Sequence, residues 1–212
     1  MDAKAHWEQV YRTKPANAVS WYQPEATLSI DLIKRVVSDL ATPIIDVGGG
    51  ASTLVDGLLD AGYSDLTVLD LAGSALAAAQ RRLGKRTSRV KWLEADVLSA
   101  AFAEGRYGLW HDRAVFHFLT DPTDRERYVA QSQRAVRQGG HVLVASFGPD
   151  GPGRCSGLDV VRYTPASMHA EFGESFSLVD SVREEHHTPA GAIQAFVYCL
   201  CRVSMRGSRK TP

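Results

Sequence analysis

A short stretch of this sequence places a carboxylate directly before a run of glycines. Asp46 lies in the otherwise apolar segment 43–47, and residues 48–50 are all glycine. The segment 52–61 follows with apolar side chains at helical spacing, so the order is strand, glycine turn and helix. Glycine lets a backbone approach a ligand closely, and α/β proteins hold nucleotides at such turns. This stretch therefore predicts a nucleotide site at the end of a strand.

Two further acids stand near the ends of strand-like segments. Asp70 is the last residue of the segment 66–70, and Asp96 closely follows the segment 90–94. An ionised carboxylate only accepts hydrogen bonds, which suits Asp70 to the two hydroxyl groups of a ribose. A dinucleotide site would need the motif G-x-G-x-x-G, but the third glycine position holds Thr53. Asp46 also stands where dinucleotide folds usually place an apolar residue. A nicotinamide-dependent oxidoreductase is thus a rival hypothesis that the pattern disfavours.

The elements that would position these acids alternate along the chain. Strands are expected at 43–47, 66–70, 90–94, 107–111 and 140–147, and the helices between them at 52–61, 74–83 and 123–136. This alternation predicts βαβ units, with a parallel sheet and helices on both faces. A loop rich in glycine and proline follows at 147–162, and then a short helix at 164–172. Two strand-like segments, 176–184 and 195–203, with a turn at 185–191, predict a terminal hairpin.

Residues 1–42 precede this pattern and are expected to form a helical arm or lid on the domain at 43–203. The arm is expected to contain helices at 3–11 and 29–40. Its aromatic side chains are Trp7, Tyr11, Trp21 and Tyr22. They either pack the arm onto the domain or form a wall over a ligand. The small, polar and basic tail at 204–212 is expected to be disordered.

The sequence resembles the class I S-adenosylmethionine-dependent methyltransferases in four features, which are the segment 46–52 (DVGGGAS), Asp70, Asp96 with Val97, and the terminal hairpin. One departure is Ser52, where many family members have a third glycine. The resemblance covers about 7–203 and implies an α/β fold with a Rossmann-like, doubly wound sheet of seven strands. The strand order would be 3-2-1-4-5-7-6, mostly parallel with an antiparallel last strand.

The resemblance implies S-adenosylmethionine as the cofactor, S-adenosylhomocysteine as the product, and no metal. In the family pattern Asp46, directly or through water, faces the ammonium side of the cofactor, and Asp70 accepts from the ribose hydroxyl groups. Asp96 accepts from the adenine amino group, and Leu71 packs on the adenine. The cofactor-binding residues so implied are Asp46, Gly48, Gly50, Ser52, Asp70, Leu71, Asp96, Val97 and His111.

The acceptor would lie beyond the carboxyl end of the strand at 107–111. Methyl transfer needs a positioned acceptor and the exclusion of water, and it needs a base only when the attacking atom must lose a proton. His111 and Asp112 are the candidates for that base. An ion pair between Asp112 and Arg113, and a structural role for His117, are the alternatives. The candidate substrate-pocket residues are Trp21, Tyr22, His117, Arg154 and His187.

The predicted function is transfer of the methyl group of S-adenosylmethionine to an N, O or S atom of a small-molecule acceptor (EC 2.1.1.-). One alternative is a protein-lysine methyltransferase of the same fold, because the aromatic entry segment is also similar to that branch of the family. Further alternatives are a binding module that keeps only the cofactor pocket, and a reaction other than methyl transfer, such as a cyclisation. The acceptor and the oligomeric state stay open.

The composition narrows the set of partners. Among 212 residues, 24 basic side chains balance 24 acidic ones, so neither nucleic acid nor an anionic membrane is an expected partner. No apolar run approaches the roughly 20 residues of a membrane-spanning helix. The three cysteines, Cys155, Cys199 and Cys201, lack metal-site spacing, which favours free thiols in a reducing compartment. A cytoplasmic location is therefore expected.

Overall fold

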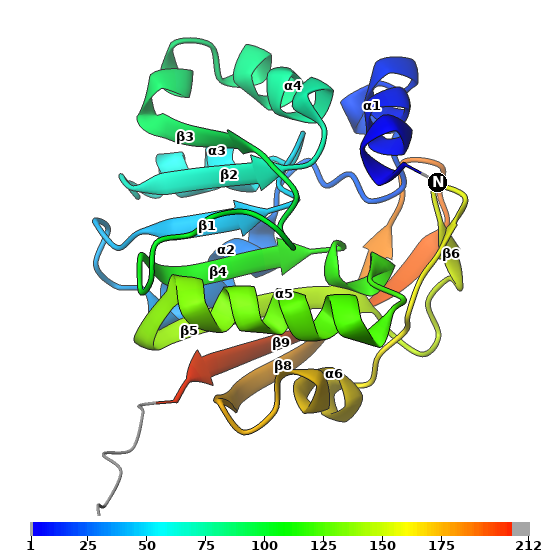
Figure 1. The fold of residues 1–212 in the computed structure, drawn as a ribbon. Helices are drawn as coiled ribbons and strands as arrows, with labels where there is room; N and C mark the ends of the chain where they lie inside the picture. Colours follow the sequence, from blue (N-terminus) through cyan, green and yellow to red (C-terminus); the bar gives the residue numbers. More distant parts are fainter. Residues whose placement is uncertain (1, 205–212) are drawn as a thin grey trace, which may run out of the picture.

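A seven-stranded sheet runs through the middle of the molecule in the order β3-β2-β1-β4-β5-β9-β8 (Figure 1). The structure, a computed structural model, describes residues 2–204. Neighbouring strands are parallel from β3 to β5, whereas β9 runs antiparallel between β5 and β8. The strands are β1 (Ile44–Val47), β2 (Leu66–Asp70), β3 (Val90–Glu94), β4 (Tyr107–Arg113), β5 (Val136–Phe147), β8 (Phe176–His187) and β9 (Ile193–Val203). The predicted fold class and strand order are confirmed, because β8 and β9 are the predicted sixth and seventh strands of the sheet. The strands β6 and β7 form a separate two-stranded sheet.

Helices cover both faces of the sheet because the central strands are apolar on both sides. Every residue of β1 is buried, with Ile44 in one hydrophobic cluster and Ile45 in the other. In Figure 1, α5 lies in front of the sheet, and α2 and α3 lie behind it. The first cluster contains side chains of α2 (Thr27–Val36), α3 (Leu54–Asp60) and α4 (Gly73–Leu83), and the second those of α5 (Pro122–Ala135) and α6 (Pro165–Phe172).

Several element boundaries differ from those predicted. The helix expected at 52–61 begins only at Leu54, because the Ser52 hydroxyl oxygen accepts from the Leu54 N–H. The helix expected at 29–40 ends at Val36. The predicted hairpin turn at 185–191 is wrong in part, since β8 continues to His187, which pairs with Ile193. His186 and His187 are therefore strand residues.

An N-terminal arm lies across the carboxyl ends of the parallel strands, near α4 (Figure 1). It consists of α1 (Ala3–Thr13), the short 3-10 helix η1 (Ala16–Ala18) and the segment that leads to α2. Lys4 pairs with Glu94 at 2.5 Å, and the Glu8 carboxylate accepts from the Ser74 N–H at 3.4 Å. These contacts tie α1 to the ends of β3 and α4. The predicted tail at 204–212 lies, except for Ser204, outside the described residues.

A buried hydrogen-bond network holds the turn that follows β4. Asp112 is fully buried, and its carboxylate accepts from the N–H groups of Val115 at 2.8 Å and Phe116 at 3.0 Å. The Tyr128 hydroxyl donates to the same carboxylate at 2.6 Å and accepts from the Trp110 indole N–H at 2.8 Å. Burial raises the pKa of Asp112 to about 6, although the hydrogen bonds oppose that rise.

Replacing Tyr128 by Phe should therefore destabilise the fold. The variant leaves the Trp110 indole N–H and an Asp112 oxygen without their shared partner, at a cost of about 1–3 kcal/mol. Denaturant unfolding measures this loss. Tyr107→Phe is a matched control, because among residues 2–204 its hydroxyl has no hydrogen-bond partner. An equal loss of stability in both variants would contradict the role assigned to the network.

Candidate active site

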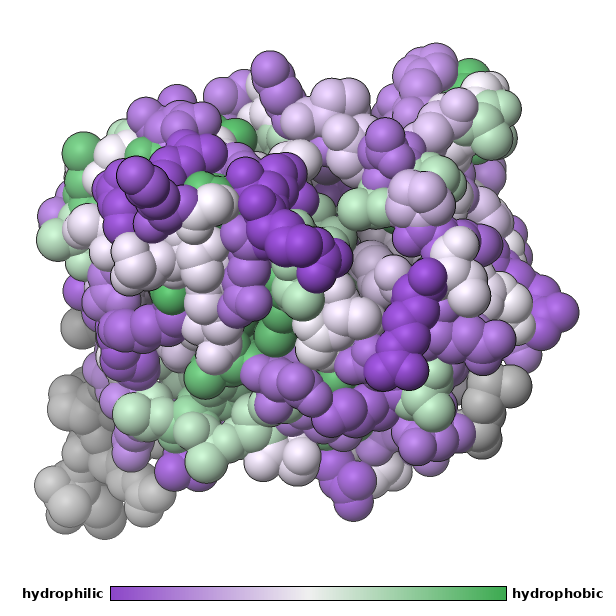
Figure 2. All heavy atoms as spheres, turned by 90° about the horizontal axis from the view of Figure 1, so that it is seen from above, coloured by the Kyte–Doolittle hydropathy of each residue, from purple (hydrophilic) through white to green (hydrophobic). Residues whose placement is uncertain are grey.

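Two adjoining cavities open at the carboxyl ends of β1 to β4. The larger has a volume of about 390 Å³ and the smaller about 40 Å³. Tyr11, Trp21, Gly48 and Arg113 line both, so the two cavities lie side by side beneath the arm. In Figure 2, which shows the α1 and α4 side of the molecule, hydrophilic side chains dominate and hydrophobic ones are scattered between them.

The glycine turn is shaped by the side chains packed around it. Gly48 has a φ of +65°, which glycine adopts freely, and a Cβ there would overlap Val115. A Cβ on Gly49 would overlap the Asp46 carboxylate, and one on Gly50 would lie 2.5 Å from Asp70 Oδ2. The turn has no side chains because two carboxylates and the loop after β4 fill the space.

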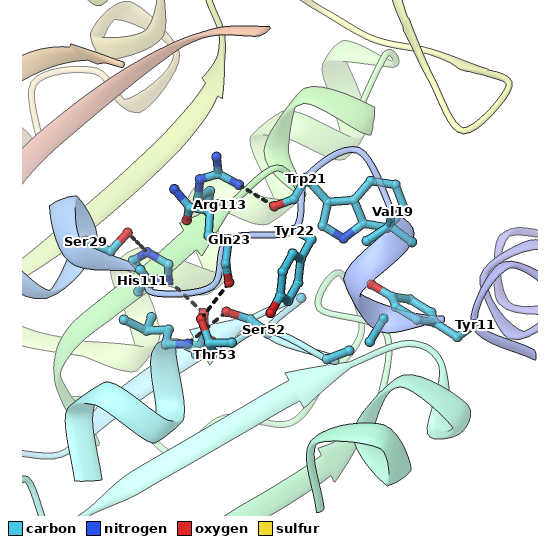
Figure 3. A pocket seen from close by; sticks show the side chains of 17 residues that line it. Tyr11, Val19, Trp21, Tyr22, Gln23, Ser29, Ser52, Thr53, His111 and Arg113 are labelled. Carbon is cyan, nitrogen blue, oxygen red and sulfur yellow. Dashed lines mark hydrogen bonds and ion pairs between the residues drawn. The ribbon is translucent and has the colours of Figure 1, made fainter. Parts of the chain in front are cut away.

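Asp46 presents one unpaired oxygen toward this turn. Its Oδ1 lies 2.7 Å from Nδ1 of His111, whereas its buried Oδ2 has no hydrogen-bond partner among residues 2–204. On its other side His111 lies 2.9 Å from the Ser29 hydroxyl, as Figure 3 shows. All three side chains line the smaller cavity, together with Ser52. A buried carboxylate oxygen without a donor fits a cationic or hydrogen-bonding ligand group.

The predicted ribose and adenine residues line the larger cavity together. They are Asp70, Leu71, Asp96 and Val97. Asp70 Oδ1 accepts from the Ala72 N–H at 2.8 Å, which leaves the second carboxylate oxygen for a ligand. Burial, together with the negative charges of Asp46 and Glu8, raises the pKa of Asp70 to about 7. A ribose that donates to this carboxylate would favour its ionised form.

Four aromatic rings line the larger cavity on the side of the arm. Trp7 makes edge contacts with Phe118, at a centroid distance of 5.0 Å, and with Trp21 at 5.8 Å. Tyr11 packs against Trp21 at 6.2 Å. Cys155 and Leu158 line the same cavity and come from the small hairpin of β6 (Arg154–Cys155) and β7 (Leu158–Asp159).

Side chains of the sheet hold the arm by its backbone carbonyl groups. Arg113 donates to the carbonyl oxygen of Trp21 at 3.1 Å, and His186 Nε2 lies 2.8 Å from that of Ser20 (Figure 3 shows the first contact). Arg113 also pairs with Glu184 at 3.2 Å and donates to the Tyr198 hydroxyl at 2.8 Å. The alternative ion pair between Arg113 and Asp112 is therefore absent, since both side chains have these other partners.

Some predicted site residues do not line either cavity. Asp112, a candidate base, belongs to the network between β4 and α5, where it is buried and its carboxylate accepts three hydrogen bonds. His117 is fully buried against Phe147, and burial lowers its pKa to about 3. Arg154 is exposed and pairs with Asp159, and His187 is exposed at the end of β8. Gly50 lies behind Asp70 rather than at the cavity surface.

Several further cavity residues were not among the predicted site residues, including Ser29, Arg113, Phe118 and Leu158. The sequence has no local signal for Ser29, because its contact with His111 depends on how α2 packs on the sheet. Arg113 could have been found from strand alternation, since it lies two residues after His111 and so on the same face.

The comparisons with known proteins agree with this architecture. Residues 44–140 match the family model of a methyltransferase domain. The eEF1A lysine and N-terminal methyltransferase of Bos taurus is 24% identical over 148 residues, which cover 67% of this chain and 21% of that protein. The chain thus spans about a fifth of the length of the curated relatives it matches.

Two solved structures share the fold. One concerns the conversion of a disulfide bond into a thioacetal group during echinomycin biosynthesis. Its TM-score is 0.76 at 16% identity, and the match covers 97% of this chain and 94% of that chain. The other is the 1,6-didemethyltoxoflavin-N1-methyltransferase of Burkholderia thailandensis with bound 1,6-didemethyltoxoflavin and S-adenosylhomocysteine. Its TM-score is 0.69 at 20% identity, and the match covers 95% of this chain and 87% of that chain.

Fold and site together define a Rossmann-like nucleotide-binding protein. The resemblance recognised from the sequence agrees with these comparisons: residues 44–140 match the model of a methyltransferase domain, and the sheet has the fold of solved S-adenosylmethionine-dependent methyltransferases. The residues fit that cofactor, because Asp46 offers an unpaired oxygen for its ammonium group, Asp70 offers one for its ribose, and the glycine turn leaves room beside them. Within residues 2–204, no group of three His, Cys, Asp or Glu side chains is arranged to hold a metal ion, and no helix is long and apolar enough to cross a membrane.

Replacing Asp70 by Asn should separate binding from stability. The native pKa of about 7 exceeds the ordinary value of 3.8, so the native state loses stability as pH rises from about 4 to 7, and the loss stays constant above pH 7. Without cofactor, the variant should be more stable than the wild type at pH 8, by roughly 2–4 kcal/mol, and equal to it near pH 4. Its affinity for S-adenosylhomocysteine should fall, because the amide oxygen is a weaker acceptor.

Thermal unfolding and calorimetry at the two pH values measure both effects. Asp96→Asn serves as the control, since it removes an exposed acid from the same cavity and should change stability by no more than roughly 0.5 kcal/mol. A destabilised Asp70→Asn variant at pH 8 would show that the burial of this acid is not a cost to the fold.

Proposed function

We propose that this chain transfers the methyl group of S-adenosylmethionine to an N, O or S atom of a small-molecule acceptor. The observation that carries the proposal is the aromatic wall over the larger cavity. Trp7, Trp21 and Phe118 cover it from the arm and from the loop after β4, next to the residues that fit the cofactor. Such a wall suits an apolar or planar acceptor and excludes water from the reaction.

The charges around this wall also favour an acceptor other than a lysine side chain. Arg113, a cation, lines both cavities, whereas its partner Glu184 lines neither. The acid Asp124 lines the larger cavity but pairs with Arg127 at 3.3 Å. Apart from Asp70 and Asp96, which are assigned to the cofactor, the larger cavity therefore offers a protonated lysine no unpaired acidic side chain.

The side chains of this protein would act by binding and orientation. When bound, S-adenosylmethionine supplies an electrophilic methyl group on a sulfonium. Asp46 and Asp70 would hold its ammonium and ribose ends, while the aromatic wall orients the acceptor for in-line attack. Among residues 2–204, no histidine or lysine lines the larger cavity, and both nitrogens of His111, which lines the smaller one, are engaged. The favoured acceptor therefore attacks as a neutral or already ionised group, such as a thiolate or a ring nitrogen.

Protein-lysine methylation is a second candidate, which the curated relatives favour, since they are named as methyltransferases of the protein eEF1A. A binding module and a non-methyl-transfer reaction are the remaining alternatives. The arm at 1–42 would serve as the lid of the site. A cytoplasmic location is also part of the proposal, and the three free, buried cysteines support it.

One experiment separates these possibilities. Purified protein is first tested for S-adenosylhomocysteine binding by calorimetry. Transfer of radiolabelled methyl from S-adenosylmethionine is then measured with aromatic thiols and nitrogen heterocycles, and in parallel with eEF1A. Binding with transfer to a small molecule supports the proposal. Transfer to eEF1A alone would replace it by protein methylation, and no binding would rule out both.

Filling the acceptor side of the cavity should block turnover but not cofactor binding. In Leu158→Trp the indole would occupy space in the larger cavity, so transfer should fall roughly tenfold or more because the acceptor is displaced. The affinity for S-adenosylhomocysteine should stay near that of the wild type. Asp159→Trp is the matched control, since Asp159 is exposed and does not line the cavity. An equal fall in both variants would show that the hairpin, rather than the filled space, matters.

A further inference from the structure

Three buried polar side chains from three different elements form a chain beside the glycine turn. Ser29 comes from α2, His111 from β4 and Asp46 from β1, and they are only 1%, 2% and 4% exposed. The Ser29 hydroxyl lies 2.9 Å from His111 Nε2, and His111 Nδ1 lies 2.7 Å from Asp46 Oδ1. Figure 3 shows Ser29 and His111 pointing toward one another.

The chemistry of the three groups fixes the direction of the hydrogen bonds. An ionised carboxylate only accepts, so Nδ1–H of His111 donates to Asp46. With one proton on the ring, Nε2 is then the acceptor, and the Ser29 hydroxyl donates to it. The chain has the connectivity of a hydrolytic Ser-His-Asp triad. However, Ser29 is almost fully buried, and the cavity beside it has only about 40 Å³, so no substrate of that kind could reach the hydroxyl.

The chain leaves Asp46 with one oxygen fixed and the other available. Oδ1 is held by His111, and the unpaired Oδ2 is the atom nearest to where a Cβ of Gly49 would lie. The carboxylate is thus held with its available oxygen against the turn, in the smaller cavity. Without His111 the Asp46 carboxylate could rotate, and either of its oxygens could turn toward the place that the imidazole ring occupies.

We propose that His111 and Ser29 are positioning residues, which orient Asp46 so that Oδ2 receives the ammonium group of the cofactor. This inference rests on the proposed function, because it assigns the amino-acid end of the same cofactor. It gives His111 a role in binding rather than in removing a proton from the acceptor. The effect should therefore appear only with ligands that carry the ammonium group.

Two ligands that differ at that end test the proposal. S-adenosylhomocysteine carries the amino-acid end, whereas 5′-methylthioadenosine keeps the adenine, ribose and sulfur but lacks it. In His111→Asn the amide nitrogen can occupy the place of Nδ1 and still donate to Asp46. In His111→Gln the amide lies nearer the place of Nε2, so Asp46 loses its donor. Calorimetry measures both ligands with each variant.

His111→Gln should lose roughly tenfold in affinity for S-adenosylhomocysteine, the size of a hydrogen bond to a charged group, and none for 5′-methylthioadenosine. His111→Asn should keep the preference of the wild type between the two ligands. Ser29→Ala, which keeps the His111–Asp46 contact but frees the ring, should show a smaller loss of the same kind. His117→Gln is the control, since this buried histidine lines neither cavity and should leave the preference unchanged.

The outcomes separate this inference from the proposed function. The wild type is expected to bind both ligands. If His111→Gln and Ser29→Ala keep the same ratio of the two affinities as the wild type, the inference alone is overturned. A parallel loss for both ligands in these variants also overturns it, because it would show a purely structural role. A wild type that binds neither ligand overturns the proposed function and the inference together.

Discussion

The structure around the site depends on two carboxylates, Asp46 and Asp70, that are buried at the ends of neighbouring strands. Burial of an acid costs free energy, and it raises the pKa of Asp70 in the free protein. The glycine run between them follows from the same constraint, since carboxylate oxygens occupy the space where side chains of Gly49 and Gly50 would lie. A ligand with donors at both places would relieve the cost. The site is therefore less favourable for the empty fold than for the complex, as is common where a fold keeps polar groups for binding.

Side chains alternate along β4, so successive residues of this strand point to opposite faces of the sheet. Trp110 and Asp112 face α5, where Tyr128 joins them and fixes the following turn. His111 and Arg113 face the cavities, where one contacts Asp46 and the other the arm. The adjacent polar residues at the end of this strand thus have different roles, and only those on one face can contact a ligand. This alternation explains why Asp112, although next to the site in sequence, takes no part in it.

The sheet and the cofactor end of the site could be predicted from the sequence because their signals are local. Apolar strands, the glycine turn and an acid at the end of a strand each lie within a few residues, and the parallel order follows from their alternation. The aromatic side of the larger cavity could not be predicted in the same way, since it is formed by contacts between distant segments. His117 has the residue type of a ligand-binding side chain, yet packing against Phe147 removes it from the cavity. Ser29 has no such signal, yet α2 brings it to His111. Residue type indicates what chemistry is available, whereas tertiary packing decides which residues are brought together.

The terminal hairpin of β8 and β9 does more than complete the sheet. Its antiparallel strands bring Glu184, His186 and Tyr198 to the end of β4, where Arg113 joins them. These side chains then contact the arm at Ser20, Trp21 and Gln23, mostly through backbone carbonyl oxygens. A carbonyl group is present whatever the side chain, so the hairpin fixes the path of the arm while the side chain of Trp21 remains free to form the cavity wall. Substitutions of the arm's aromatic side chains can therefore change the shape of the larger cavity without removing the contacts that hold the arm on the domain.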